Sequence, residues 1–147
     1  MPEQPELRVL IVGNPDPSHV GAHLAAGARS LGCAVQICDT SRAFAAPWPV
    51  ARYNWWLRGH YPSRLGAFSA EVLDQCAAWR PDLLIATGLA PLQPATLDAI
   101  GRLGIVRLNF LTDDPWNPTH RAPWFMHGLP AYDLICSPRR ANLADLG

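Results

Sequence analysis

Five short apolar runs recur along this chain, and they constrain its fold more than any other feature of the sequence. They cover residues 7–13, 34–39, 82–88, 105–111 and 133–137. Continuous apolar runs of this length are typical of strands that are buried on both faces of a parallel sheet. Apolar residues at helical spacing fill most of the intervals between the runs. This alternation predicts an α/β fold, because each pair of parallel strands needs a crossover connection.

We therefore expect a Rossmann-like three-layer sandwich with a mostly parallel sheet of about five strands. Crossovers of this kind are right-handed, which leaves few arrangements, and we predict the strand order 3-2-1-4-5. The 147 residues suit one domain, spanning 1–147, with one sizeable core.

The expected helices have recognisable ends. Ser18 is placed to cap a helix that stops at Gly32, and Ser63 is placed to cap a second helix that ends before Pro81. Pro94 begins a shorter helix, and a further helix starts near the C-terminus. Residues 40–62 show no clean period, so we expect an irregular connection of the kind that is usually functional or disordered.

Composition excludes several classes of protein. The formal net charge is zero and there is no basic run, so the electrostatic signature of a nucleic-acid binder is missing. The N-terminal residues lack the apolar stretch of a signal peptide, and no run reaches the roughly 20 apolar residues that cross a bilayer. We expect a cytoplasmic protein with no transmembrane segment. Its four cysteines form no CxxC pair, so buried free thiols are more plausible than a disulfide or a metal site.

Polar residues gather where the predicted strands end. They are Asn14, Pro15, Asp16, Pro17, Ser18 and His19 after the first strand, Thr87 and Gly88 at the end of the third, Thr112, Asp113 and Asp114 after the fourth, and Ser137 and Pro138 after the fifth. Ligands of such folds bind beyond the carboxyl ends of the strands, where the strand order reverses. We therefore expect these residues to share one ligand-binding edge.

Several specific chemistries can be excluded at this edge. The first loop, GNPDPSH, is neither the GxGxxG of dinucleotide-binding folds nor the GxxxxGK[ST] of P-loops. It also lacks the spacing of a DxHxxG cobalamin motif. The chain has no GxSxG nucleophile motif, and its five histidines make no tight set of metal ligands. We expect no metal site.

What remains is carboxylate and histidine chemistry. Asp113 and Asp114 are adjacent, and because like charges repel, one of them is a candidate general base with a raised pKa. The alternative is that one carboxylate caps the following turn while the other faces solvent. His19 stands at the start of a helix, where the dipole favours the neutral, basic imidazole. It is equally compatible with a surface or capping role.

Aromatic residues are the second signal. Trp55 and Trp56 fall in the 40–62 segment together with Trp48, Tyr53 and Tyr61, and Trp116 follows the paired carboxylates. This density of aromatic rings argues against disorder. Flat rings can pack against the apolar C–H faces of a sugar, so we expect Trp55, Trp56 and Trp116 to shape a substrate pocket. The alternative is a small satellite core under a long loop.

Several segments also carry a family resemblance. RVLIVGNPDPSHVGAHLAAGARSLG, RPDLLIATGLAPL, NFLTDDPWNP and YDLICSPRRANLADLG together resemble the N-terminal half of a GT-B fold glycosyltransferase. The branch that they most resemble is the CgeB-like, spore-maturation-type family. The resemblance covers nearly the whole chain, and its most specific piece is TDDPWNP; the opening loop is only weakly specific.

The resemblance implies a division of labour between two domains. The N-terminal domain would hold a sugar or glycosylated acceptor and supply the base, while a C-terminal domain would hold the nucleotide-sugar donor, with no bound metal. Asp113, Asp114 or His19 would be the base, and Asn14, Thr87, Gly88, Thr112 and the tryptophans would bind substrate. Residues 1–147 would then be the acceptor-side half, binding no cofactor alone, with a donor domain of ~150 residues or more still needed. The rival interpretation is a non-catalytic flavodoxin-like module that senses a ligand or docks a partner.

Overall fold

The computed structural model describes residues 6–147 and contains a five-stranded, all-parallel sheet. The strands are β1 (Arg8–Gly13), β2 (Ala34–Asp39), β3 (Leu83–Thr87), β4 (Val106–Phe110) and β5 (Leu134–Cys136). They lie in the order β2-β1-β3-β4-β5. The predicted Rossmann-like α/β class and the five parallel strands are confirmed.

The predicted order 3-2-1-4-5 is wrong, because β3 pairs with β1 and leaves β2 at an edge. The burial of the strands explains the difference. All but the first residue of β1 are buried, whereas β2 is mostly half-buried and carries Gln36, which accepts a hydrogen bond from Gln75 Nε2 at 2.7 Å. A strand with a polar residue tolerates an edge, and the apolar β1 and β3 need neighbours on both sides.

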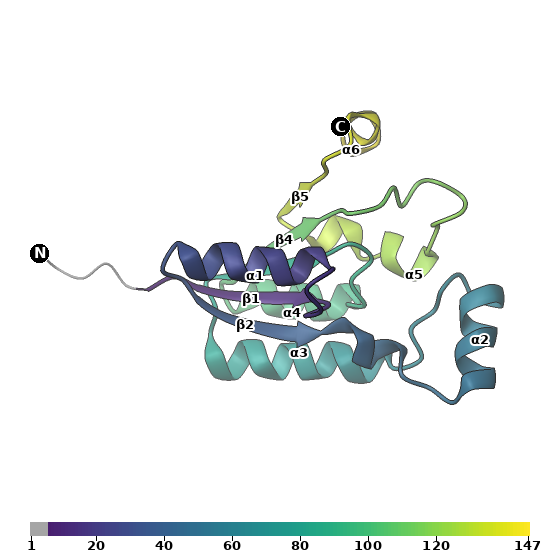
Figure 1. Cartoon of the computed structure of the whole chain (residues 1–147), viewed down its shortest axis with the longest axis horizontal. Coiled ribbons are helices and arrows are strands. Elements are labelled where there is room, and N and C mark those ends of the chain that lie inside the picture. The colour runs from purple at the N-terminus through teal and green to yellow at the C-terminus, as the bar shows by residue number, and fades with distance from the viewer. Residues whose placement is uncertain (1–5) are drawn as a thin grey trace, which may run out of the picture.

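Three principal helices cover the two faces of the sheet. α1 (Val20–Ser30) packs over one face, where Val9, Ile11 and Ala25 form a small core. α3 (Leu65–Trp79) and α4 (Pro94–Arg102) pack together over the other face and enclose the larger core. Figure 1 shows α1 and α3 on opposite sides of the strands, so the predicted three-layer arrangement is present.

The remaining elements are short, with one exception. The 3-10 turn η1 (Thr40–Phe44) follows β2. Helix α5 (Pro123–Met126) and the 3-10 turn η2 (Leu129–Ala131) follow β4. η3 (Arg140–Asn142) and α6 (Leu143–Leu146) follow β5. The exception is α2 (Trp48–Leu57), a ten-residue helix in the segment for which we predicted an irregular connection. Its apolar residues point in most directions, so no helical period is visible in the sequence.

Neither predicted serine cap forms. The N-cap of α1 is His19 and that of α3 is Arg64, both without a side-chain capping bond. The Ser18 hydroxyl instead donates to Asp16 Oδ1 at 2.6 Å, and the Ser63 hydroxyl accepts from Asn54 Nδ2 at 2.7 Å. Each serine hydroxyl therefore bonds to another side chain and does not cap its helix.

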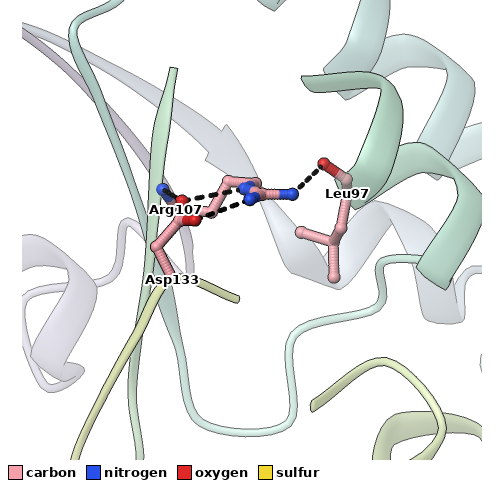
Figure 2. A network of polar contacts seen from close by, with 3 residues as sticks. All are labelled: Leu97, Arg107 and Asp133. Carbon is pink, nitrogen blue, oxygen red and sulfur yellow. Dashed lines mark hydrogen bonds and ion pairs between the residues drawn. The ribbon is translucent and has the colours of Figure 1, made fainter. Parts of the chain in front are cut away.

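A charged latch joins β5 to the rest of the sheet (Figure 2). The Arg107 guanidinium donates to both Asp133 carboxylate oxygens, from Nε at 2.9 Å and from Nη2 at 2.7 Å. Its Nη1 also donates to the Leu97 carbonyl in α4 at 2.9 Å. Hydrogen bonding to Arg107 lowers the pKa of Asp133. The latch lies at the amino ends of the strands, opposite the edge where ligands are expected.

All four cysteines are free thiols, as expected from the sequence. Cys38 and Cys76 are buried, and burial raises their pKa values to about 11 and about 12, so both are protonated near neutral pH. Cys33 is half-buried and Cys136 is exposed, so the expectation of burial holds for two of the four. Within residues 6–147, none of the helices combines the length and the apolar character that crossing a membrane requires.

Candidate functional site

A pocket opens beyond the carboxyl ends of β1 and β3, where the strand order reverses. Its volume of about 540 Å³ lies within the range of roughly 300–1,000 Å³ that is usual for small-molecule sites. The lining residues follow the ends of four strands or lie in the helices α1 and α2: Asn14, Ser18, His19, Val20, Gly21, Thr40, Ser41, Phe44, Trp55, Thr87, Gly88, Leu89, Thr112 and Asp113. The predicted convergence of Asn14, Thr87 and Asp113 at one edge is therefore confirmed.

The loop after β1 forms one wall and is held by its own side chains. Asn14 Oδ1 accepts the N–H of Asp16 at 2.9 Å, and Asp16 Oδ1 accepts the N–H of Ser18 at 2.9 Å. The Ser18 bonds lower the pKa of Asp16. The N–H of His19 donates to the Asp16 carbonyl, and Pro15 and Pro17 have no N–H. The loop thus offers side chains to a ligand rather than the free backbone N–H groups that cradle a phosphate.

The ends of β3 and β4 form a second wall in close contact with β1. A Cβ at Gly13 would lie 2.6 Å from Thr87 Oγ1, and a Cβ at Gly88 would lie 2.7 Å from Thr112 Oγ1. Gly88 also has a φ of +57°, which favours glycine. Its N–H donates to the Phe110 carbonyl at 2.8 Å, so the Thr87–Gly88 corner is fixed against β4.

Asn109 supports this corner from beneath and was missed by the sequence analysis. Its side chain is fully buried in β4, and its Nδ2 donates to the Gly88 carbonyl at 3.2 Å. A polar residue inside an apolar run, just before the TDDPWNP segment, was the signal available in the sequence. Buried amides of this kind fix backbone that would otherwise be unpaired.

The adjacent carboxylates separate in the structure. Asp113 is exposed and lines the pocket, where its Oδ2 accepts from Thr112 Oγ1 at 3.3 Å. Asp114 turns away: its Oδ1 accepts the N–H of Trp116 at 3.0 Å, and its carbonyl accepts the N–H of Asn117 at 3.2 Å. The two side chains therefore follow the alternative in which one carboxylate closes a turn, and Asp113 is the one that faces the pocket.

His19, the residue before α1, also lines the pocket. It is exposed, and its carbonyl accepts the N–H of Ala22 at 3.2 Å at the start of α1. Two of the three candidate bases, His19 and Asp113, therefore line the pocket.

Only one of the three predicted tryptophans reaches the pocket. Trp55 lines it and packs against His60, with ring centroids 4.2 Å apart and ring planes tilted by 41°. Trp56 points outward on α2, where it borders a shallow depression with Arg52, Tyr53 and Leu57. Trp116 packs against the small core of Leu111, Ala122, Phe125 and Leu129. For Trp116 the alternative of a satellite core is therefore the one observed.

Two further strand ends behave differently from expectation. Thr40 and Ser41 line the pocket after β2, with Phe44 beside them, and the sequence analysis did not propose them. The strand-end rule would have found Thr40, since it directly follows β2. Ser137 after β5 is taken up by a local turn, because its Oγ accepts from Arg139 N and Asn142 Nδ2, both at 3.1 Å.

The chemistry of this pocket is that of hydroxyls, an amide, one carboxylate, one imidazole and one indole ring. Across residues 6–147, His, Cys, Asp and Glu side chains form no group of three that could hold a metal ion. The pocket can hydrogen-bond a polyhydroxylated molecule, pack a ring against its apolar face, and accept a proton from it.

Comparison with known proteins gives a fold-level likeness. No family model matches the sequence, and no curated protein does either. The chain is similar to the glycosyltransferase SnogD from Streptomyces nogalater, with a TM-score of 0.49 and 20% identity over 71% of this chain and 35% of that one. It is also similar to a pilus assembly-related protein from Burkholderia pseudomallei K96243, with a TM-score of 0.45 and 19% identity over 95% of this chain and 85% of that one.

Both likenesses concern the fold alone, because the identities are low. The chain spans about a third of the length of that glycosyltransferase. The choice between functions therefore depends on the pocket itself.

Proposed function

We propose that this domain is the acceptor side of a glycosyltransferase, in which the pocket between β1 and β3 holds a sugar or a glycosylated acceptor. The observation that carries the proposal is that Asp113 and Trp55, which are far apart in the sequence, line the same pocket. An indole ring and a carboxylate set among hydroxyl and amide groups are what a sugar acceptor requires: a flat surface, hydrogen-bond partners and a base.

The reaction follows from this placement. An acceptor hydroxyl would donate its proton to Asp113 while its oxygen attacks the anomeric carbon of a nucleotide sugar. The new bond joins that carbon to the acceptor oxygen, and the bond to the nucleotide diphosphate breaks with both electrons leaving on phosphate. Asn14 and the hydroxyls of Thr87 and Thr112 would orient the acceptor. His19 is the second candidate base.

The nucleotide-sugar donor would be held by a second, C-terminal domain of the CgeB-like GT-B type. The loop after β1 supports this assignment, because the N–H groups of Asp16, Ser18 and His19 are already paired within the loop. These three loop N–H groups are therefore not available to a diphosphate.

A second candidate function is favoured by the strand order. The order 2-1-3-4-5 is that of flavodoxin-like folds, which also bind ligands at the junction of β1 and β3. A non-catalytic module that senses a small ligand would use the same pocket.

Calorimetric titration of residues 1–147 tests the assignment of the pocket to an acceptor sugar. As the acceptor side of a transferase, the domain should bind members of a panel of free sugars and glycosides, and should show no saturable micromolar binding of UDP- or GDP-sugars. Trp55→Ala should weaken sugar binding about 2- to 10-fold, the loss expected for one aromatic contact. Trp48→Ala, an exposed tryptophan on the same helix outside the pocket, is the matched control and should bind as the parent does.

The opposite pattern would contradict the proposal. If UDP- or GDP-sugars bind tightly and free sugars do not, or if Trp48→Ala weakens binding as much as Trp55→Ala, the pocket is not an acceptor site and the ligand-sensing module is preferred.

A further inference from the structure

α2 has its apolar and polar sides reversed relative to an ordinary surface helix. Its one buried residue is Asn54, whereas Trp48 is 71% exposed, Trp56 72% and Leu57 74%. Tyr53 and Val50 are also exposed. A surface helix normally buries its apolar stripe and presents its polar face to water. Large exposed apolar surfaces mark sites of interaction with a partner or a membrane.

Polar contacts in the C-terminal half of α2 and just after it hold the helix in this orientation. Asn54 Nδ2 donates to Ser63 Oγ at 2.7 Å, and the Trp124 indole N–H donates to the Gly59 carbonyl at 3.0 Å. Gly59 and His60 both have a φ of +58°, which reverses the chain sharply after the helix. The outward apolar face is therefore fixed by the fold and is not a consequence of a loosely attached helix. Figure 1 shows α2 standing out beyond the carboxyl ends of the strands.

The charge around α2 is of one sign. Between Asp39 and Glu71 the chain contains four arginines, at positions 42, 52, 58 and 64, and no Asp or Glu. Glu71 pairs with Arg42 and Arg64. Arg52 and Arg58 instead lie over aromatic rings, with their Cζ atoms 5.5 Å from the Trp48 centroid and 4.2 Å from the Tyr61 centroid. The apolar face is thus edged by guanidinium groups that no described carboxylate neutralises.

From these observations we infer that α2 is a docking surface for an anionic lipid bilayer. Trp and Tyr rings settle at the boundary between lipid headgroups and acyl chains, and short helices with apolar faces and basic edges lie in that boundary. Arginines near the surface add attraction to anionic headgroups. A projecting, convex helix inserts into a fluid surface without needing a complementary groove. The inference rests on residues outside the pocket, so it stands or falls independently of the proposed function.

Vesicle flotation tests the inference. The 147-residue chain should float with vesicles of phosphatidylcholine mixed with phosphatidylglycerol, more weakly with phosphatidylcholine alone, and less in high salt. The double variant Trp48→Ala/Trp56→Ala should lose about tenfold or more in vesicle binding, because two large apolar side chains no longer insert. Arg52→Gln should lose about fivefold on anionic vesicles only.

Matched controls are available on α1 and at its end. Leu31→Ala removes an 83% exposed leucine and Arg29→Gln removes an exposed arginine, and both variants should float as the parent does. Circular dichroism melts check that each variant is folded.

Three results would overturn the inference: no flotation with either vesicle, flotation that the Trp48→Ala/Trp56→Ala variant retains, or equal losses in the α1 controls. Sedimentation equilibrium adds a fourth, since a dimer that the double variant dissociates, without vesicle binding, would make α2 a contact between copies of this chain.

Discussion

At the scale of single residues, the TDDPWNP segment divides its two carboxylates between a pocket and a turn. Asp113 meets the pocket, while Asp114 closes a turn around Pro115 through the N–H of Trp116. Two adjacent side chains past a strand leave the backbone in different directions, so the sequence limits the candidates to this pair but cannot choose between them. The turn bonds make that choice.

This division predicts opposite effects on stability. Asp114→Ala removes the acceptor of a turn N–H and should cost about 0.5–2 kcal/mol of unfolding free energy, by analogy with lost helix caps. Asp113→Ala changes an exposed side chain and should lie within about 0.5 kcal/mol of the parent. Urea unfolding measures both. A larger loss for Asp113→Ala would mean that Asp113 is structural, which would remove it as the favoured base.

Pocket residues were predictable where a strand end fixes them. The carboxyl ends of parallel strands meet at one edge of the sheet, so residues that end or follow a strand must lie at that edge. This rule correctly placed Asn14, Thr87, Gly88 and Thr112. Trp56 and Trp116 were not predictable in this way. Their placement depends on which face of α2 turns inward and on packing against Phe125, and neither follows from local sequence pattern.

At the scale of elements, the Arg107–Asp133 latch ties β5 to β4 and α4, and it gives a prediction with a pH dependence. Its hydrogen bonds lower the pKa of Asp133 below its ordinary 3.8. The ion pair therefore contributes its full stability above that value, and the contribution is lost as the pH falls through the lowered pKa. The Asp133 side chain is 42% exposed, so solvent weakens the pair.

We expect Asp133→Asn to lower the unfolding free energy by about 0.5–1 kcal/mol at neutral pH. The difference from the parent should shrink in urea titrations at pH values below 3.8, because the parent carboxylate then becomes protonated. Glu71→Gln is the control. It removes the ion pairs with Arg42 and Arg64, whose arginines are more exposed than Arg107, and should lower the unfolding free energy by less. A difference that persists unchanged at low pH would show that the charge of Asp133 does not matter.

Elements differed in how far the sequence determined them. The strands and the helices α1, α3 and α4 follow from apolar periodicity and from Gly32 and Pro81 at helix ends. α2 does not, because its apolar residues are spread over its exposed surface and only Asn54 is buried. A helix that is held by polar contacts near its C-terminal end, and not by a buried apolar face, leaves no periodic signal in the sequence.

At the scale of the whole molecule, the strand order decides where the site lies. With β1 between β2 and β3, the chain reverses direction across the sheet at the β1–β3 junction, and the pocket forms there. Our predicted order would have made β3 an edge strand and moved the reversal to the β1–β4 junction. The apolar character of β1 and β3 against the half-buried β2 was the available signal, but crossover rules alone permit both orders.

Binding of an acceptor sugar in the β1–β3 pocket can be tested by an NMR titration of isotopically labelled residues 1–147 with the sugars that bind in calorimetry. We expect the shifted amide signals to cluster at Asn14, Thr87, Thr112 and Asp113, together with the indole N–H signal of Trp55. Shifts that cluster elsewhere on the domain, or a pocket that responds to UDP- or GDP-sugars and to no free sugar, would contradict the proposal.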